Sequence, residues 1–422
     1  MKRRNLSNRQ LKSLIILYLI LGPVNWIPGI SPIWVNLSKY FLFAIILISA
    51  LARNQVRFVR PLSLTFLFFT LLCCLPALIN GAGNMVFNLV DFLMIFLVSM
   101  VVGTLLYSMD EWFEIFHAAV KGFSILALVI LILPYLGFNP QAPAPWANSS
   151  LGQSGLGGYR TGWSNSIFLY VPFLAIIYLK EKEALKRYGY LIAIAAILIL
   201  QYKCAGRAGL IASLLSLLLL FRKKTWAFVF LVLAGGIAVL SLGEEAIKSN
   251  FRMDEASINV KKGTSELDRI SSGRIQGYDA SLKLLMENPI IGYGFNRNED
   301  VLELYRVKVE VHNTYLKRWL EGGLAMIFNI FLIFFLVQKE YRRKISGMDS
   351  TFRTFAVIFL FVPLLIALME PNYLIGSFQG ECFYWFMVIV QLSRPEPTGK
   401  AAPQTLVPDN KTKPHPAGVI IR

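Results

Sequence analysis

The chain has 422 residues, of which 55% are hydrophobic, 13% aromatic and only 16% charged. This composition is too apolar for an ordinary water-soluble domain, so membrane lipids must surround much of the protein. A net charge of +17 is also found in nucleic-acid-binding proteins, but here the basic residues form short clusters between apolar runs, so we expect no nucleic-acid partner.

Apolar runs close to the length that crosses ~30 Å of hydrocarbon recur from residue 11 to residue 392. The sequence therefore predicts an all-α fold, a polytopic membrane bundle of about twelve transmembrane helices. The first nine predicted spans cover residues 11–30, 33–51, 62–80, 86–107, 113–136, 165–179, 188–202, 208–221 and 225–243. The tenth ends at residue 337, and the last two cover residues 352–369 and 374–392.

Short basic clusters set the expected orientation of these spans. They occur before the first span and in the loops around residues 53–60, 180–187, 222–224 and 339–344. Counting crossings from a cytoplasmic N-terminus puts all of them on the cytoplasmic side, in agreement with the positive-inside rule. We therefore expect a multi-pass protein with both termini in the cytoplasm.

The same counting divides the chain into four parts. Residues 1–243 hold spans one to nine, and residues 312–392 hold spans ten to twelve. Between them, residues 244–311 form a nearly neutral hydrophilic stretch, which predicts a helical lobe on the non-cytoplasmic side. The tail, residues 393–422, is rich in Pro, Lys and Thr, and we expect it to be disordered.

The lobe carries one well-marked helix. Ser272 is a predicted N-cap before Arg274, Asn288 and Pro289 predict the end, and the following glycines at 292 and 294 predict a tight turn. Apolar residues recur at helical spacing and predict an amphipathic helix: Ile275, Tyr278, Leu282, Leu285 and Met286.

Span ten contains an unusual concentration of charge. Its apolar run, residues 324–337, is too short to cross the membrane, so the helix is expected to include the preceding turns with Lys317, Arg318 and Glu321. An ion pair of Glu321 with one of these bases within the helix is the simplest expectation. Three further acids in or near spans, Asp91, Glu370 and Glu381, are expected to neutralise arginines that line a cavity and receive no catalytic role.

Four segments carry a family resemblance. GRIQGYDASLKLLMENPIIGYGFNRN from residue 273 and VHNTYLKRWLEGG from residue 311 resemble the signature of the O-antigen ligase and polymerase family of bacterial surface polysaccharide assembly. YRTGW at residues 159–163 with Asn165, and AGRAG at residues 205–209, are similar to two further motifs of that family. Gly206 stands where the family usually has Ser, and Tyr278 where it commonly has Trp. The resemblance covers residues 159–337.

The resemblance implies a membrane glycosyltransferase in the bacterial inner membrane, and the count of crossings predicts that its active site lies on the periplasmic face. Such enzymes move a glycan from an undecaprenyl-diphosphate carrier to an acceptor sugar hydroxyl, without metal or other cofactor and with inversion at the anomeric carbon. The acceptor is a lipid A core or another lipid-linked glycan. The implied partners are therefore the donor, the acceptor and membrane lipids.

The residue types suit this chemistry. A diphosphate leaving group gains negative charge, and guanidinium groups can bind two of its oxygens, which makes Arg207 and Arg274 candidate clamps and Arg160 a third candidate. The acceptor hydroxyl needs a base, and a histidine has an unperturbed pKa near ~6.5. Of the three histidines, only His312 is predicted on the non-cytoplasmic side, since His117 lies near the cytoplasmic end of span five and His415 in the tail.

Each of these residues has a simpler alternative role. His312 could be a structural histidine at a helix terminus, Arg207 an interfacial anchor, Arg274 a solvated residue at a helix start, and Arg160 a loop residue with local contacts. For the whole protein, the alternative function is a transporter or flippase of lipid-linked sugars, although no internal repeat is visible. A lipid-binding scaffold without turnover is the third hypothesis.

Overall fold

The computed structural model describes residues 7–24, 30–53, 112–137, 160–204, 206–222, 274–294, 311–345 and 350–370, with isolated positions 64, 65, 68, 71, 72, 79, 229, 236 and 302. All elements assigned in this part of the chain are helices, which confirms the predicted all-α class there. They are α1 (Asn8–Leu21), α2 (Pro32–Ala52), α5 (Trp112–Ile132), the 3-10 helix η1 (Leu133–Leu136), α6 (Arg160–Ile167), α7 (Tyr170–Lys180), α8 (Ala184–Lys203), α9 (Arg207–Phe221), α13 (Arg274–Glu287), α15 (Thr314–Ile345) and α16 (Ser350–Ala367).

Six stretches within these ranges are long and apolar enough to cross a membrane: Ile33–Ala52, Phe113–Ile132, Trp163–Lys180, Ala184–Lys203, Thr314–Lys339 and Ser350–Ala367. The apolar helix α9 is shorter. The chain is thus a multi-pass membrane protein. Eight of the twelve predicted spans overlap with described helices, although the first, 11–30, overlaps only with α1, which ends at Leu21. The spans at 86–107, 225–243 and 374–392, most of the span at 62–80, most of the lobe and the tail lie outside the described residues.

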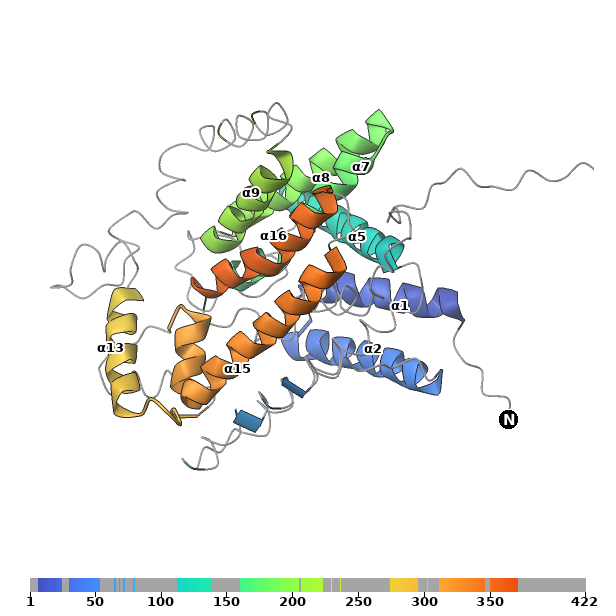
Figure 1. Cartoon of the computed structure of the whole chain (residues 1–422). Helices are drawn as coiled ribbons and strands as arrows, with labels where there is room; N and C mark the ends of the chain where they lie inside the picture. The colour runs from blue at the N-terminus through green and yellow to red at the C-terminus, as the bar shows by residue number, and fades with distance from the viewer. Residues whose placement is uncertain are drawn as a thin grey trace, which may run out of the picture.

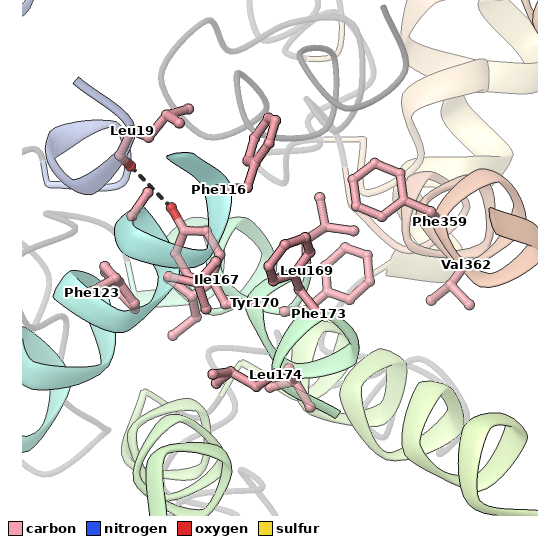
Figure 2. Packing of buried hydrophobic residues seen from close by; sticks show 14 of the residues in the cluster. Leu19, Phe116, Phe123, Ile167, Leu169, Tyr170, Phe173, Leu174, Phe359 and Val362 are labelled. Atoms are coloured by element: carbon pink, nitrogen blue, oxygen red, sulfur yellow. Dashed lines mark hydrogen bonds between the residues drawn. The ribbon is translucent and has the colours of Figure 1, made fainter. Parts of the chain in front are cut away.

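Helix α7 lies in the middle of the bundle. Nine consecutive residues, Tyr170 to Tyr178, are buried, as expected of a helix that is apolar all round. Figure 2 shows Phe173 of α7 among aromatic and aliphatic side chains from neighbouring helices, and the Tyr170 hydroxyl donates a 3.1 Å hydrogen bond to the carbonyl of Leu19 in α1. This hydrogen bond connects α1 to α7 in the middle of the bundle.

Helix α13 lies beside the first turns of α15, at one end of the molecule and away from the marked N-terminus (Figure 1). The helix ends at Glu287, as predicted, but its buried face is not the predicted apolar one. Of the five predicted positions, Leu285 is buried, whereas Ile275, Leu282 and Met286 are exposed. The buried face contains small residues that allow close packing against α15: Gly277, Ala280 and Ser281, with Leu284 and Leu285.

Helix α15 is broken at Gly323, where φ is +71° and ψ is −168°. Span ten is therefore not the continuous helix expected from the sequence, because its first turns and its apolar run are separated by a non-helical residue. The turn after α13 packs into this break, and Gly292, with a φ of +75°, lies against the backbone of Gly323. Glycines permit this backbone conformation and this close approach.

The turn also replaces the hydrogen bonds that the break removes. In a continuous helix, the N–H groups of Leu324 and Ala325 would bond to the carbonyls of Leu320 and Glu321. Here two donors and one acceptor come from the turn. Tyr293 N–H donates to the Leu320 carbonyl (2.7 Å), Gly294 N–H donates to the Glu321 carbonyl (3.0 Å), and Leu324 N–H donates to the Pro289 carbonyl (3.0 Å).

Candidate functional site

Arg207 is the first residue of α9 and is half-buried. The preceding residue, Gly206, is fixed by the Ser164 hydroxyl, which donates a 2.9 Å hydrogen bond to the Gly206 carbonyl. A Gln201 side-chain N–H donates to the Ser164 carbonyl at 3.0 Å. These bonds hold the start of α9 against α6 and α8. The backbone at Arg207 is therefore fixed by two neighbouring helices.

The close contact between α6 and α9 depends on Gly209. A Cβ atom at this position would lie 2.5 Å from the Ser164 carbonyl oxygen, so only glycine allows the two helices to approach this far. Arg160 is the first residue of α6, one helical turn before Ser164. The two arginine motifs are thus in contact through Ser164 on one side and Gly206 and Gly209 on the other.

Arg274 begins α13, and its positive charge acts unfavourably on the charged form of Arg207. The two residues are 67 positions apart in the sequence and come from different helices. Bringing two guanidinium groups together costs free energy, which an anion bound near both would offset. The role of the two arginines as a diphosphate clamp stays a prediction.

Tyr278 joins Arg274 to His312. Its hydroxyl donates a 2.8 Å hydrogen bond to the backbone carbonyl of His312. Burial raises the pKa of Tyr278, the neighbouring Arg274 charge lowers it, and Glu370 raises it further. The hydroxyl is therefore held in the protonated, donating form beyond the usual range of tyrosine.

His312 is half-buried and lies two residues before the start of α15. The next residue, Asn313, caps this helix, since its side-chain oxygen accepts a 3.0 Å hydrogen bond from the Leu316 N–H. The Asn cap on one side and the Tyr278 hydroxyl on the other fix the backbone of His312. The backbone position of His312 near the start of α15 is therefore fixed.

Glu370 adds a buried acid to the same region. It is 8% exposed, and its carbonyl accepts a 2.6 Å hydrogen bond from the Thr314 hydroxyl at the start of α15. Its charge also acts on Tyr278. We call the five residues that these contacts connect the site cluster: Arg207, Arg274, Tyr278, His312 and Glu370.

The expected ion pair of span ten is present. Arg318 bonds to Glu321 within the first turns of α15, and both side chains are fully buried. Lys317 beside them is 5% exposed. The intrahelical pair predicted from the sequence is thus the one formed by Arg318.

The other histidine in the described residues lies elsewhere. His117 in α5 forms a 2.9 Å hydrogen bond with the Tyr190 hydroxyl of α8. His415, Asp91 and Glu381 lie outside the described residues. Within the described ranges, no group of three or more His, Cys, Asp or Glu residues is arranged to hold a metal ion.

The sequence predicted Arg207, Arg274 and His312 on the same side of the membrane. It predicted no role in the site for Tyr278 or Thr314. Tyr278 is four residues after Arg274, so the two share a helix face, and this spacing was the available signal. Glu370 was expected to neutralise arginines. Its charge reaches Tyr278, and the neutralising role remains a prediction.

Residues 189–331 match the family model described as O-antigen ligase. The match covers about one third of the chain and includes Arg207, Arg274, Tyr278 and His312, whereas Arg160 and Glu370 lie outside it. A comparison with curated proteins gives no match. The family resemblance seen in the sequence motifs is confirmed over the matched region.

Proposed function

Since residues 189–331 support assignment to the O-antigen ligase and polymerase family, we propose that this membrane protein transfers a glycan from an undecaprenyl-diphosphate carrier to a sugar hydroxyl. The family indicates a membrane glycosyltransferase of this type in polysaccharide and lipopolysaccharide biosynthesis. The donor carrier, the mechanism and the site residues are our proposals. The observation that supports them is the hydrogen bond from Tyr278, in the helix that begins with Arg274, to the His312 backbone, together with the electrostatic effect of Arg274 on Arg207.

In the proposed reaction, the acceptor oxygen attacks the anomeric carbon from the face opposite the diphosphate, which inverts that centre. The new carbon–oxygen bond forms as the bond to the diphosphate oxygen breaks, and the electron pair leaves with the diphosphate. His312 accepts the hydroxyl proton, and the guanidinium groups of Arg207 and Arg274 bind the departing phosphate oxygens. Arg160 is the third proposed phosphate ligand, and the proposed step needs no metal.

We also propose the topology given by the basic clusters. With twelve spans and both termini in the cytoplasm, the site cluster faces the periplasm, where lipid-linked glycans are presented. The family implies lipid-linked glycan and lipid A core partners in general terms. Either a lipid A core or a second lipid-linked glycan can serve as acceptor in this scheme.

The test is transfer by purified full-length protein, given the lipid-diphosphate-linked glycan and each acceptor separately. We expect His312→Ala and Arg274→Ala to lose at least about a hundredfold in kcat, the scale of removing a base or an oxyanion ligand. His117→Ala and Arg222→Ala are matched controls, because His117 lies in α5 and Arg222 ends α9 at the end opposite Arg207. Full transfer activity of correctly folded His312→Ala and Arg274→Ala variants would contradict the mechanism.

One observation favours the second candidate, a transporter or flippase of lipid-linked sugars. Broken helices with buried charges are typical of transporter sites, and α15 has both, a break at Gly323 and the buried Arg318–Glu321 pair. Formation of a new glycosidic bond in detergent solution, where nothing can be transported, distinguishes the two. A protein that moves labelled carrier across vesicles but forms no bond would be a transporter.

A further inference from the structure

Three large apolar side chains at the end of α13 and in the next turn are exposed, which we call the apolar tip: Met286 (83% exposed), Ile290 (69%) and Ile291 (40%). We propose that the apolar tip is inserted among the lipid acyl chains of one membrane leaflet, the leaflet opposite the basic cluster at residues 339–344. This inference does not depend on the proposed glycosyl transfer.

The first argument is continuity with a lipid-facing surface. Four residues of α15 at helical spacing are exposed along one face, as expected of a spanning helix that touches lipid: Leu324 (52%), Phe328 (69%), Phe331 (60%) and Phe335 (59%). The Leu324 N–H donates to the carbonyl of Pro289, the residue before Ile290. The apolar tip therefore begins where the lipid-facing row of α15 ends.

The second argument is depth. Lys339 and Arg342 are exposed and basic, so they mark the aqueous boundary at one end of α15. Gly323 precedes Lys339 by 16 residues, which is about 24 Å along a helix axis. The hydrocarbon core is ~30 Å thick, and any tilt shortens the distance along the membrane normal. Gly323, and the Ile290 carbonyl packed against it, thus lie beneath the opposite boundary.

The third argument is the free energy that would be needed to move the turn out of the hydrocarbon. At hydrocarbon depth, a break in a helix is tolerated only when its backbone groups find other partners. Residues 289–294 supply those partners for α15. Lifting the turn into water would leave the carbonyls of Leu320 and Glu321 without these bonds, so the backbone holds the apolar tip in place.

The neighbouring polar face of α13 provides a matched comparison. Lys283 and Asp279 form an exposed 2.7 Å ion pair one helical turn from Met286. Charged residues of this kind lie in water or in the headgroup region. The helix thus presents a polar stripe to water, and its end presents apolar side chains to lipid.

The experiment uses the full-length protein in nanodiscs, with Ile290→Cys or Met286→Cys labelled by an environment-sensitive NBD fluorophore. Lys283→Cys is the matched control on the same helix. The wild-type chain, with its four cysteines, gives the background. We expect blue-shifted emission at positions 290 and 286, with quenching by doxyl-labelled phospholipids at least threefold greater than at position 283.

Equal quenching at positions 290, 286 and 283 would overturn the proposal, because the tip would then lie in water or at the same level as the ion pair. Blue-shifted emission without lipid quenching would also overturn it, since protein would then cover the tip, either a second copy or another part of the chain. Glycosyl transfer by the same samples is measured separately. Loss of transfer with normal quenching leaves the lipid contact standing.

Discussion

The hydroxyl of Tyr278 is bonded to the carbonyl of His312, 34 residues later in the chain. Tyr278 belongs to the helix that begins with Arg274, whereas His312 precedes the helix of span ten. One hydrogen bond thus connects the helix of the proposed phosphate ligand to the backbone of the proposed base. It fixes the His312 backbone against α13.

The first prediction concerns this hydroxyl. Tyr278→Phe removes the donor to His312, and we expect a loss of about 1 kcal/mol in unfolding free energy and a fivefold to tenfold decrease in kcat with little change in KM. Tyr293→Phe is the control, because its hydroxyl donates to the Leu284 carbonyl of the same helix at 2.9 Å. Steady-state kinetics and thermal unfolding check both. A kcat for Tyr278→Phe equal to that of Tyr293→Phe would mean that the bond has no positioning role.

The second prediction concerns the break in α15. A Cβ atom on Gly323 would lie 1.8 Å from the Ile290 carbonyl oxygen, at a φ of +71° that side chains rarely adopt. We expect Gly323→Ala to destabilise the protein by at least about 1–3 kcal/mol, because strain and collision act together. Gly189→Ala, where a Cβ would meet nothing within 4 Å, should be neutral or slightly stabilising. Thermal unfolding in detergent compares them, and equal midpoints would contradict the described turn.

The third prediction concerns the buried ion pair. Glu321→Ala leaves the fully buried guanidinium of Arg318 without this carboxylate, and we expect a loss of about 3–5 kcal/mol. Replacing both residues with apolar ones, as Arg318→Met with Glu321→Leu, should recover most of that loss. The measurement is a double-mutant cycle on unfolding free energy. Strictly additive effects would show that the two side chains do not interact.

The fourth prediction concerns the contact between the two arginine motifs. Gly209→Ala forces α6 away from α9, because the added Cβ collides with the Ser164 carbonyl. The displacement moves the start of α6, where Arg160 lies, and should lower kcat about 10-fold to 100-fold. Gly189→Ala again serves as the control. Unchanged turnover in Gly209→Ala would remove α6 from the proposed site.

Much of the bundle could be predicted because lipid imposes a simple rule. An apolar run of sufficient length in hydrocarbon must be helical, since no other single segment satisfies its own backbone groups. The ranges of α2, α5, α8, α9 and α16 follow from that rule to within a few residues. The end of α13 was also predictable, because Asn288 and Pro289 do not continue a helix.

The break in α15 was not predictable from the same rule. Two successive glycines, Gly322 and Gly323, permit a break but do not require one. What stabilises it is a turn more than 25 residues earlier, and no local pattern relates the two segments. The buried face of α13 was mispredicted for a related reason. Small residues such as Gly277 and Ala280 are buried there, and hydropathy does not predict which face of α13 packs against α15.

In the candidate site, residue chemistry and motif resemblance indicated Arg207, Arg274 and His312. A hydrogen bond from the helix of Arg274 reaches the His312 backbone, and the charge of Arg274 acts on Arg207. The connecting residue, Tyr278, was visible in the sequence only as an apolar position of the predicted helix and as a substitution for the usual Trp. Its importance depends on where its hydroxyl points, which is a matter of tertiary packing. Catalytic roles for these residues remain predictions until transfer is measured.

The completion of α15 by residues 289–294 has a consequence for how the protein is made. The ribosome synthesises these residues before α15, so the turn must wait for its partner to emerge and enter the bilayer. Neither segment reaches its final hydrogen bonding alone, and membrane insertion of one is therefore coupled to maturation of the other during biogenesis.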